Sequence, residues 1–267
     1  MKYAFMSFST PALTLDEMLA TAKRHGYDGI EPRLVADHAH GIEVQISAAA
    51  RREVRAKVTD SGIALACIAT SCLYANPATA QQNVEETLRC IDLAGDVGAP
   101  TIRVFGGQLG EGLSRQDAIM LVAESLLKVS DRAAARSVVV CVETHDHWCE
   151  PTHLAAVLGL VNHPAIAINW DIMHPVRVAK ATMDSAFETV RPWIRHVHFH
   201  DGAKDGSTAL APIGEGVIDH KRAVELLMSL PYDGFLSGEW INWDDPYEVH
   251  LPRELATMRA YEGLASR

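Results

Sequence analysis

The amino-acid sequence predicts a single α/β domain, a (β/α)8 TIM barrel that spans residues 1–267. The length of 267 residues is close to the roughly 250 that such barrels need. Eight short apolar runs alternate with helical stretches, a rhythm typical of parallel α/β folds. No G-x-G-x-x-G motif follows the first run, which argues against an open dinucleotide-binding sheet. Eight units therefore favour a closed barrel.

The strand-like runs are mostly continuous stretches of apolar residues and do not alternate strictly between apolar and polar. This pattern is typical of parallel strands that are covered on both faces. The predicted strands are residues 3–8, 28–33, 63–70, 100–106, 138–144, 166–171, 195–200 and 235–240.

The segments between the runs carry helix start and stop signals. Thr14 and Glu17 form a capping-box pattern at the start of the first predicted helix. Ser47 and Ser114 are expected to cap two further helices, the second of which runs toward Arg136. Glycines expected at helix C-termini just before strands are Gly26, Gly62 and Gly98.

Composition excludes several functional classes. The formal net charge of −10 opposes binding to nucleic acid, which needs clustered Lys and Arg. The five cysteines are scattered and form no CxxC pair, which predicts a reduced cytoplasmic protein without a disulfide framework. No stretch approaches 18 uninterrupted apolar residues, and the N-terminus turns polar too early for a secretory signal. A membrane partner is therefore not expected.

Four side chains that suit a metal ion lie at the ends of four predicted strands. They are Glu143, Asp171, His198 and Glu239. Three carboxylates and one imidazole suit a hard or borderline divalent cation. In a barrel of parallel strands the C-terminal strand ends converge on one mouth. The sequence therefore predicts one divalent ion shared by these four residues.

Histidines accompany two of these carboxylates. His145 follows Glu143 closely, and we expect it to orient a carboxylate or a substrate oxygen. The alternative is a solvated polar loop. His174 follows Asp171 by three residues, a step that brings both side chains to the same mouth. Here the alternative is that Asp171 caps the next helix and His174 only packs.

Two other strand ends carry polar residues with competing interpretations. His196, His198 and His200 share one face if their run is a strand, which indicates either a metal site or a set of rim histidines. Glu239 needs a partner because an unpaired buried carboxylate is costly. That partner is a metal, a substrate hydroxyl or Arg103, the last as an ion pair across the barrel.

The second strand and the tryptophans complete the set of candidate substrate contacts. Glu31 is expected to bind either substrate or the nearby Arg33. Trp148 is expected at the mouth, where aromatic walls suit the C–H face of a sugar. The tryptophans expected to join it there are Trp170, Trp240 and Trp243.

Motifs along nearly the whole chain resemble the xylose isomerase-like superfamily, the TIM barrels that include ketose 3-epimerases and endonuclease IV. The resemblance rests on residues 26–31, Arg103-Val-Phe-Gly-Gly107, Glu143-Thr-His145, Asp171-Ile-Met-His174, His198-Phe-His-Asp201 and Gly238-Glu-Trp240. It implies one divalent ion on the four strand-end ligands, with Mn²⁺ expected and Mg²⁺, Co²⁺ or Zn²⁺ as alternatives. It also implies a homodimer or homotetramer.

The resemblance further implies an acid/base role for Glu143 and Glu239 and a substrate-hydroxyl contact for His174. Two departures from the epimerase pattern affect the substrate. His200 stands where the epimerases have lysine. Their substrate-binding arginine after the seventh strand has no match, and Lys204 is the nearest candidate.

The resulting hypothesis is a divalent-metal-dependent isomerase or epimerase of a sugar or sugar phosphate, acting by proton transfer through a cis-enediolate. The first alternative is a dehydratase on an inosose- or keto-acid-type substrate, since elimination would use the same site. An endonuclease IV-like nuclease is a less favoured alternative, because it needs extra histidines at strands two and three and this chain has none there. A catalytically idle sugar-binding module is a further alternative.

Overall fold

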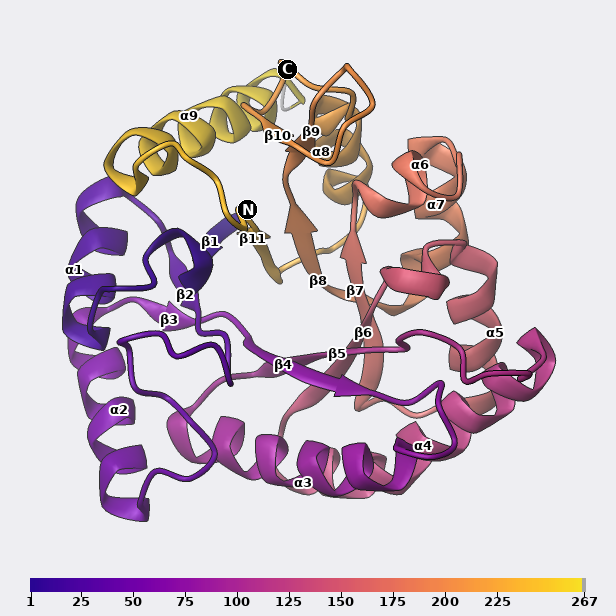
Figure 1. The fold of residues 1–267 in the computed structure, drawn as a ribbon. Helices are drawn as coiled ribbons and strands as arrows, with labels where there is room; N and C mark the ends of the chain where they lie inside the picture. Colours follow the sequence, from indigo (N-terminus) through magenta and orange to yellow (C-terminus); the bar gives the residue numbers. More distant parts are fainter. Residues whose placement is uncertain (266–267) are drawn as a thin grey trace.

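A ring of parallel strands surrounded by helices forms the centre of the molecule, as the computed structural model of residues 1–265 shows (Figure 1). The hydrogen-bonded order is β3-β2-β1-β11-β8-β7-β6-β5-β4. β3 and β4 are successive pieces of one strand, and a parallel bridge between Arg33 and Ala69 joins the two ends of the order. The nine strands thus nearly close into the barrel that the sequence predicts.

The strands are β1 (Lys2–Met6), β2 (Gly29–Glu31), β3 (Ala64–Leu65), β4 (Ile68–Leu73), β5 (Thr101–Phe105), β6 (Val139–Glu143), β7 (Ile166–Asp171), β8 (Ile194–Phe199) and β11 (Phe235–Gly238). The α-helices are α1 (Leu15–His25), α2 (Ala48–Ser61), α3 (Ala80–Val97), α4 (Arg115–Ala135), α5 (Pro151–Val161), α6 (His174–Arg177), α7 (Met183–Val190), α8 (His220–Met228) and α9 (Tyr247–Ala265). Short 3-10 turns are η1 (Ser7–Ser9), η2 (Asp146–Trp148) and η3 (Arg191–Trp193).

The predicted boundaries are confirmed to within a few residues, with two differences. Ala66 and Cys67 interrupt the third strand and divide it into β3 and β4. After β8 the chain forms a small antiparallel hairpin, β9 (Asp201–Gly202) with β10 (Leu210–Ala211), that the sequence pattern does not indicate. In Figure 1 this hairpin lies beside α8 at the rim.

Local signals set the helix ends. The Thr14–Glu17 capping box is present in full, and the side chains of Ser47 and Ser114 accept backbone N–H bonds at the starts of α2 and α4. The helices α1, α2 and α3 each end at a left-handed glycine, which has no Cβ to oppose a positive φ. These short-range predictions are confirmed.

Alternate residues of each strand pack into two different layers, the barrel interior and the layer between strands and helices. In β7, Ile166, Ile168 and Trp170 belong to the apolar core between strands and helices. The two-residue period leaves Asn169 and Asp171 for the barrel interior. Both are fully buried. The interior therefore turns polar toward the C-terminal end of the strands, where the candidate site lies.

None of the described helices is both long and apolar enough to cross a bilayer. The five cysteine thiols are free and buried.

Candidate metal and active site

Four side chains from different strands converge inside the C-terminal mouth of the barrel. Glu143 ends β6, Asp171 ends β7, His198 lies near the end of β8, and Glu239 directly follows β11. One ligand atom from each lies within 4.8 Å of the other three, and all four residues are buried. Metal–ligand bonds of about 2–2.6 Å place ligands of one ion within such a distance of one another. The structure therefore brings together the predicted set.

His198 is the centre of this cluster. Its Nδ1 lies 2.8 Å from Glu143 Oε1 and 3.3 Å from Glu239 Oε2. Its Nε2 lies 3.0 Å from Glu31 Oε1. A carboxylate behind the ring fixes the orientation of a metal-binding histidine and selects which nitrogen faces the ion. Nδ1 is thus the nitrogen presented to the two glutamates.

The cluster carries a strong local charge imbalance. Burial by itself would lower the pKa of His198, but the carboxylates of Glu31, Glu143 and Glu239 raise it well above its usual value. Burial would also raise the pKa of Glu239, yet the charges of His198 and Arg103 bring it down to about 2. The lowered pKa values of Glu31 and Glu239 hold these two carboxylates as anions, and protonated His198 offsets charge that a divalent cation would neutralise.

One glutamate oxygen is left without a hydrogen bond. Glu143 Oε2 lies 3.2 Å from Arg103 Nε, but among the described residues neither atom has a hydrogen-bond partner. A buried polar atom without a partner is costly and calls for an explanation. The orphaned oxygen, together with three carboxylates and an imidazole, fits a divalent metal ion.

Asp171 has two roles, one for each oxygen. Oδ1 accepts backbone N–H bonds from Met173 (2.8 Å) and His174 (2.9 Å) at the start of α6, although the N-cap residue of this helix is Met173 and not Asp171. Oδ2 lies 2.8 Å from Nε2 of His200 and belongs to the cluster. Thr144 adds a further support, because its Oγ1 accepts the Asp171 N–H at 2.9 Å. The sequence offered no signal for Thr144.

Three histidine rings form a row beside Asp171. The His145 and His174 ring centroids are 4.2 Å apart, and those of His174 and His200 are 5.5 Å apart. Burial lowers the pKa of His174. Burial is also the largest single influence on His145, but the contact with Asp146 and the charges of Glu143, Asp146 and Glu239 together outweigh it and raise the pKa of His145 to about 9. The two predicted histidines, His145 and His174, thus lie side by side, with a neutral His174.

Two predicted substrate contacts are engaged with the protein. Both oxygens of Glu31 are bonded to imidazoles, Oε1 to His198 and Oε2 to His196 at 2.8 Å. Glu31 therefore supports His198 through Nε2, the ring nitrogen opposite the one that faces Glu143 and Glu239. Arg103 is 1% exposed, and its Nη2 lies 3.9 Å from Glu239 Oε1. The ion-pair alternative for Arg103 thus has a counterpart in the structure.

The aromatic wall predicted at the mouth is wrong, because the tryptophans pack elsewhere. Trp148 is fully buried, and its Nε1 donates to Gly107 O at 2.9 Å. Its ring lies against Gly106, where a Cβ would come within 2.3 Å. Trp170 packs on Phe187 of α7. Trp170 faces the strand–helix layer because it shares the two-residue period of Ile166 and Ile168 in β7, whereas Trp148 packs into that layer from η2. The two remaining tryptophans, Trp240 and Trp243, stack on each other beside His250 of α9.

Lys204 lies in the exposed loop after β8, beyond the buried cluster. Two further buried polar residues inside the barrel, Asn169 and Ser237, were not among the candidates. Their side-chain polar atoms have no hydrogen-bond partner in the described residues. Both pair in register with strands of the site, Asn169 opposite Glu143 and Ser237 opposite His198. Their inward position follows from strand register, which the sequence pattern did not reveal.

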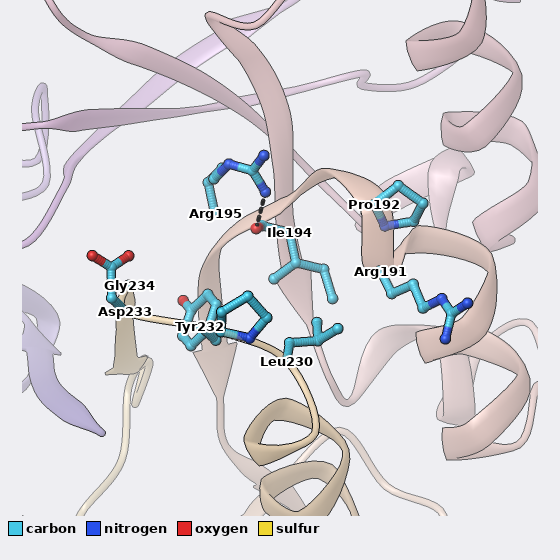
Figure 2. A pocket seen from close by; sticks show the side chains of 9 residues that line it. Arg191, Pro192, Ile194, Arg195, Leu230, Tyr232, Asp233 and Gly234 are labelled. Carbon is cyan, nitrogen blue, oxygen red and sulfur yellow. Dashed lines mark hydrogen bonds between the residues drawn. The ribbon is translucent and has the colours of Figure 1, made fainter.

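A cavity of about 310 Å³ lies at the other end of the barrel, where β8 begins and the chain enters β11 (Figure 2). Arg191, Arg195, Tyr232 and Asp233 are among its lining residues. Arg195 donates to Ile194 O at 2.8 Å, the contact drawn in Figure 2. None of the predicted site residues lines this cavity. Barrel active sites lie at the opposite, C-terminal face.

Comparison with known proteins places this geometry in a family. Residues 19–261 match the model described as Xylose isomerase-like TIM barrel. A 3-dehydroshikimate dehydratase of Bacillus anthracis is 25% identical over 286 residues, covering all of both chains. The solved L-ribulose 3-epimerase superposes with a TM-score of 0.82 at 20% identity and covers 100% of this chain and 96% of its own. A probable 3-DHS dehydratase from Bacillus anthracis gives 0.79 at 23% identity, with coverage of 97% and 99%.

Proposed function

Because the chain belongs to the Xylose isomerase-like TIM barrel family, we propose that it is a divalent-metal-dependent isomerase or epimerase of a sugar or sugar-derived substrate. The observation that carries the proposal is the convergence of ligand atoms from Glu143, Asp171, His198 and Glu239 within 4.8 Å. These four residues would hold the ion. A bound divalent cation would polarise a substrate carbonyl and its neighbouring hydroxyl.

Glu143 and Glu239 supply the proton-transfer groups in this proposal. They come from β6 and from the end of β11, and both approach His198 Nδ1, at 2.8 and 3.3 Å. A pKa of about 2 keeps Glu239 in its basic form at neutral pH. Glu239, as a carboxylate, would remove a proton from the carbon next to the carbonyl. Glu143, entering the step as a carboxylic acid, would then give a proton to the opposite face of that carbon, or Glu239 would return its own proton to the neighbouring carbon while a proton passes between the two oxygens. The first outcome is epimerisation and the second is isomerisation.

The histidine row orients the substrate. His174 has a side chain that is 20% exposed, and its Nε2 lies 3.9 Å from Asp171 Oδ2. Because burial keeps the ring neutral, it has one donor and one acceptor nitrogen for a hydroxyl. His145 packs against it and is held by Asp146 at 3.0 Å. Fixing the hydroxyl aligns the reacting carbon with the glutamates.

A dehydratase is the second candidate function, favoured by the full-length relative that is a 3-dehydroshikimate dehydratase. The first step is the same proton abstraction by a glutamate. The electrons of the broken C–H bond then expel a hydroxyl from the next carbon, and protonation of that group releases water. The same carboxylate pair serves both reactions, so the substrate decides between them.

Solvent isotope exchange tests both candidates. Mn²⁺-loaded protein is incubated in D2O with a panel of ketoses, an inosose and 3-dehydroshikimate, and products are followed by NMR and mass spectrometry. Deuterium in a rearranged product of unchanged composition supports an isomerase or epimerase. A product that has lost one water identifies the dehydratase.

The matched variants are Glu239→Gln, which should abolish exchange, and Glu124→Gln, an exposed α4 residue that should leave exchange at the wild-type rate. The proposal fails if exchange with the panel is equally fast in Glu239→Gln and wild type, or if no panel member exchanges while Mn²⁺ is bound.

A further inference from the structure

A cavity of about 320 Å³ lies between α6 and the loop that follows β8. Small-molecule sites occupy roughly 300–1,000 Å³, so it is large enough for a ligand group. Three of its seven lining residues are cationic, and none is acidic. The lining residues are Val176, Arg177, Lys180, Ala203, Lys204, Gly206 and Val217. On a chain with a net charge of −10, such a concentration of positive charge is a local exception.

Two of the three cations have no carboxylate partner among the described residues. Arg177 donates to the backbone oxygen of Ser207 and to Met173 Sδ at 3.8 Å. Hydrogen bonds from Ser207, and to a smaller extent the charge of Arg177, lower the pKa of Asp205 in the loop. Asp205 itself accepts the Ser207 N–H at 2.9 Å and does not line the cavity. Lys180 Nζ donates to Arg177 O at 2.7 Å, and within residues 1–265 neither Lys180 nor Lys204 forms an ion pair. An anion placed beside these two lysines would gain favourable charge interactions.

The loop that carries Lys204 is a fixed structure. Asp201 accepts four backbone N–H bonds, from Gly202 and Ile218 through Oδ1 and from Gly214 and Gly216 through Oδ2, at 2.9–3.1 Å. These bonds bind the two ends of the loop to one buried carboxylate.

Gly202 gives Arg177 its place against this loop. A Cβ at residue 202 would lie 2.2 Å from Arg177 Nη1, so any larger residue there would have to displace the guanidinium. The cavity wall is therefore built by specific contacts on both sides, from α6 and from the loop.

The cavity also adjoins the candidate site along the chain. Arg177 is one helical turn beyond His174 on α6, and α6 begins three residues after Asp171. On the other side, the loop directly follows β8, which carries His198. A ligand that reaches His174 is therefore close to the cations.

Resting on the proposed function, we infer that this cavity receives a phosphate or carboxylate group of the substrate. The substrate class would then be a sugar phosphate or a polyhydroxy acid. Lys180 and Lys204 supply point charges, and Arg177 supplies part of the wall.

Inorganic phosphate is the direct probe. Calorimetric titration at low ionic strength should show saturable phosphate binding to the wild-type protein, weakened tenfold or more in the Lys180→Ala/Lys204→Ala variant. Lys180→Arg/Lys204→Arg should restore it. The control, Lys23→Ala/Lys128→Ala, removes two exposed lysines of α1 and α4 and should bind like wild type. No saturable wild-type binding, or equal loss in the control, would overturn the inference.

Kinetics distinguish the source of the anion. Phosphate should compete with substrate, and the alanine pair should raise KM tenfold or more for anionic substrates but not for neutral sugars. Phosphate that binds without competing would show a free-anion site and overturn the substrate assignment. The titration does not depend on turnover, so a protein that binds phosphate at these lysines but shows no exchange in D2O would count against the proposed function only.

Discussion

Replacing Glu31 by Gln should weaken metal binding although Glu31 is not one of the predicted ligands. The carboxylate accepts from His198 Nε2 at 3.0 Å and from His196 Nε2 at 2.8 Å, and it is fully buried. Glutamine has one acceptor oxygen and one NH2 donor, so it satisfies only one of two N–H donors. If the amide faces His198 with its NH2, Nε2 must accept and the ring proton moves to Nδ1. Nδ1 is the nitrogen that faces Glu143 and Glu239.

The expected magnitude follows from this loss of support. Removing the carboxylate behind a metal-binding histidine typically costs 10–100-fold in affinity, or about 1.4–2.8 kcal/mol. The upper end applies here because water cannot replace the partner at a buried position. The variant should still fold, since the size and shape of the side chain are kept.

Mn²⁺ affinity is measured by competition with a fluorescent chelator, with circular dichroism to check that the variant is folded. Glu248→Gln is the control, because the exposed Glu248 pairs with Arg24 and His25 at the surface. A Kd within twofold of wild type in folded Glu31→Gln would refute the reasoning. Equal weakening in Glu248→Gln would show that general loss of negative charge is the cause.

Three further predictions concern the same site. Glu239→Gln should keep measurable Mn²⁺ binding but lose turnover, because an amide cannot accept the proton. If the variant kept more than about a tenth of wild-type kcat, a loss under ~1.4 kcal/mol, Glu239 would not be the essential base. His174→Ala should lower kcat/KM by about 1–3 kcal/mol with little change in Tm, whereas a large Tm drop with unchanged kinetics would show a packing role. The pKa of His198 is raised, so below that pKa the ring must lose a proton before it can bind Mn²⁺, and Mn²⁺ affinity should rise roughly tenfold per pH unit in this range. Equal Kd values at pH 6 and pH 7 would contradict this.

Much of the fold was predictable because its signals are short-range. The apolar runs, the capping side chains of Thr14, Ser47 and Ser114, and the C-terminal glycines act within a few residues of their own positions. The cluster of Glu143, Asp171, His198 and Glu239 was predictable for a related reason. Once the strands are parallel, their C-terminal ends must meet, so residues at strand ends come together without knowledge of side-chain detail.

What the sequence could not decide is the direction and partner of each side chain, which depend on strand register and barrel closure. Glu31 and His198 are 167 residues apart, and only the closed barrel places the carboxylate behind the imidazole. Trp148 and Trp170 occupy predicted mouth segments, yet both are buried in the outer layer, Trp170 by the two-residue period of β7 and Trp148 by packing from η2 against Gly106. Arg177, Lys180 and Lys204 likewise share a cavity only because the tertiary structure brings α6 against the loop after β8, where Arg177 donates to Ser207 O. The identity of the residues at the strand ends is thus set by local sequence. The partners that orient those residues, and the side chains that share a cavity with one another, are set by tertiary structure, because these contacts arise between residues that no local pattern links.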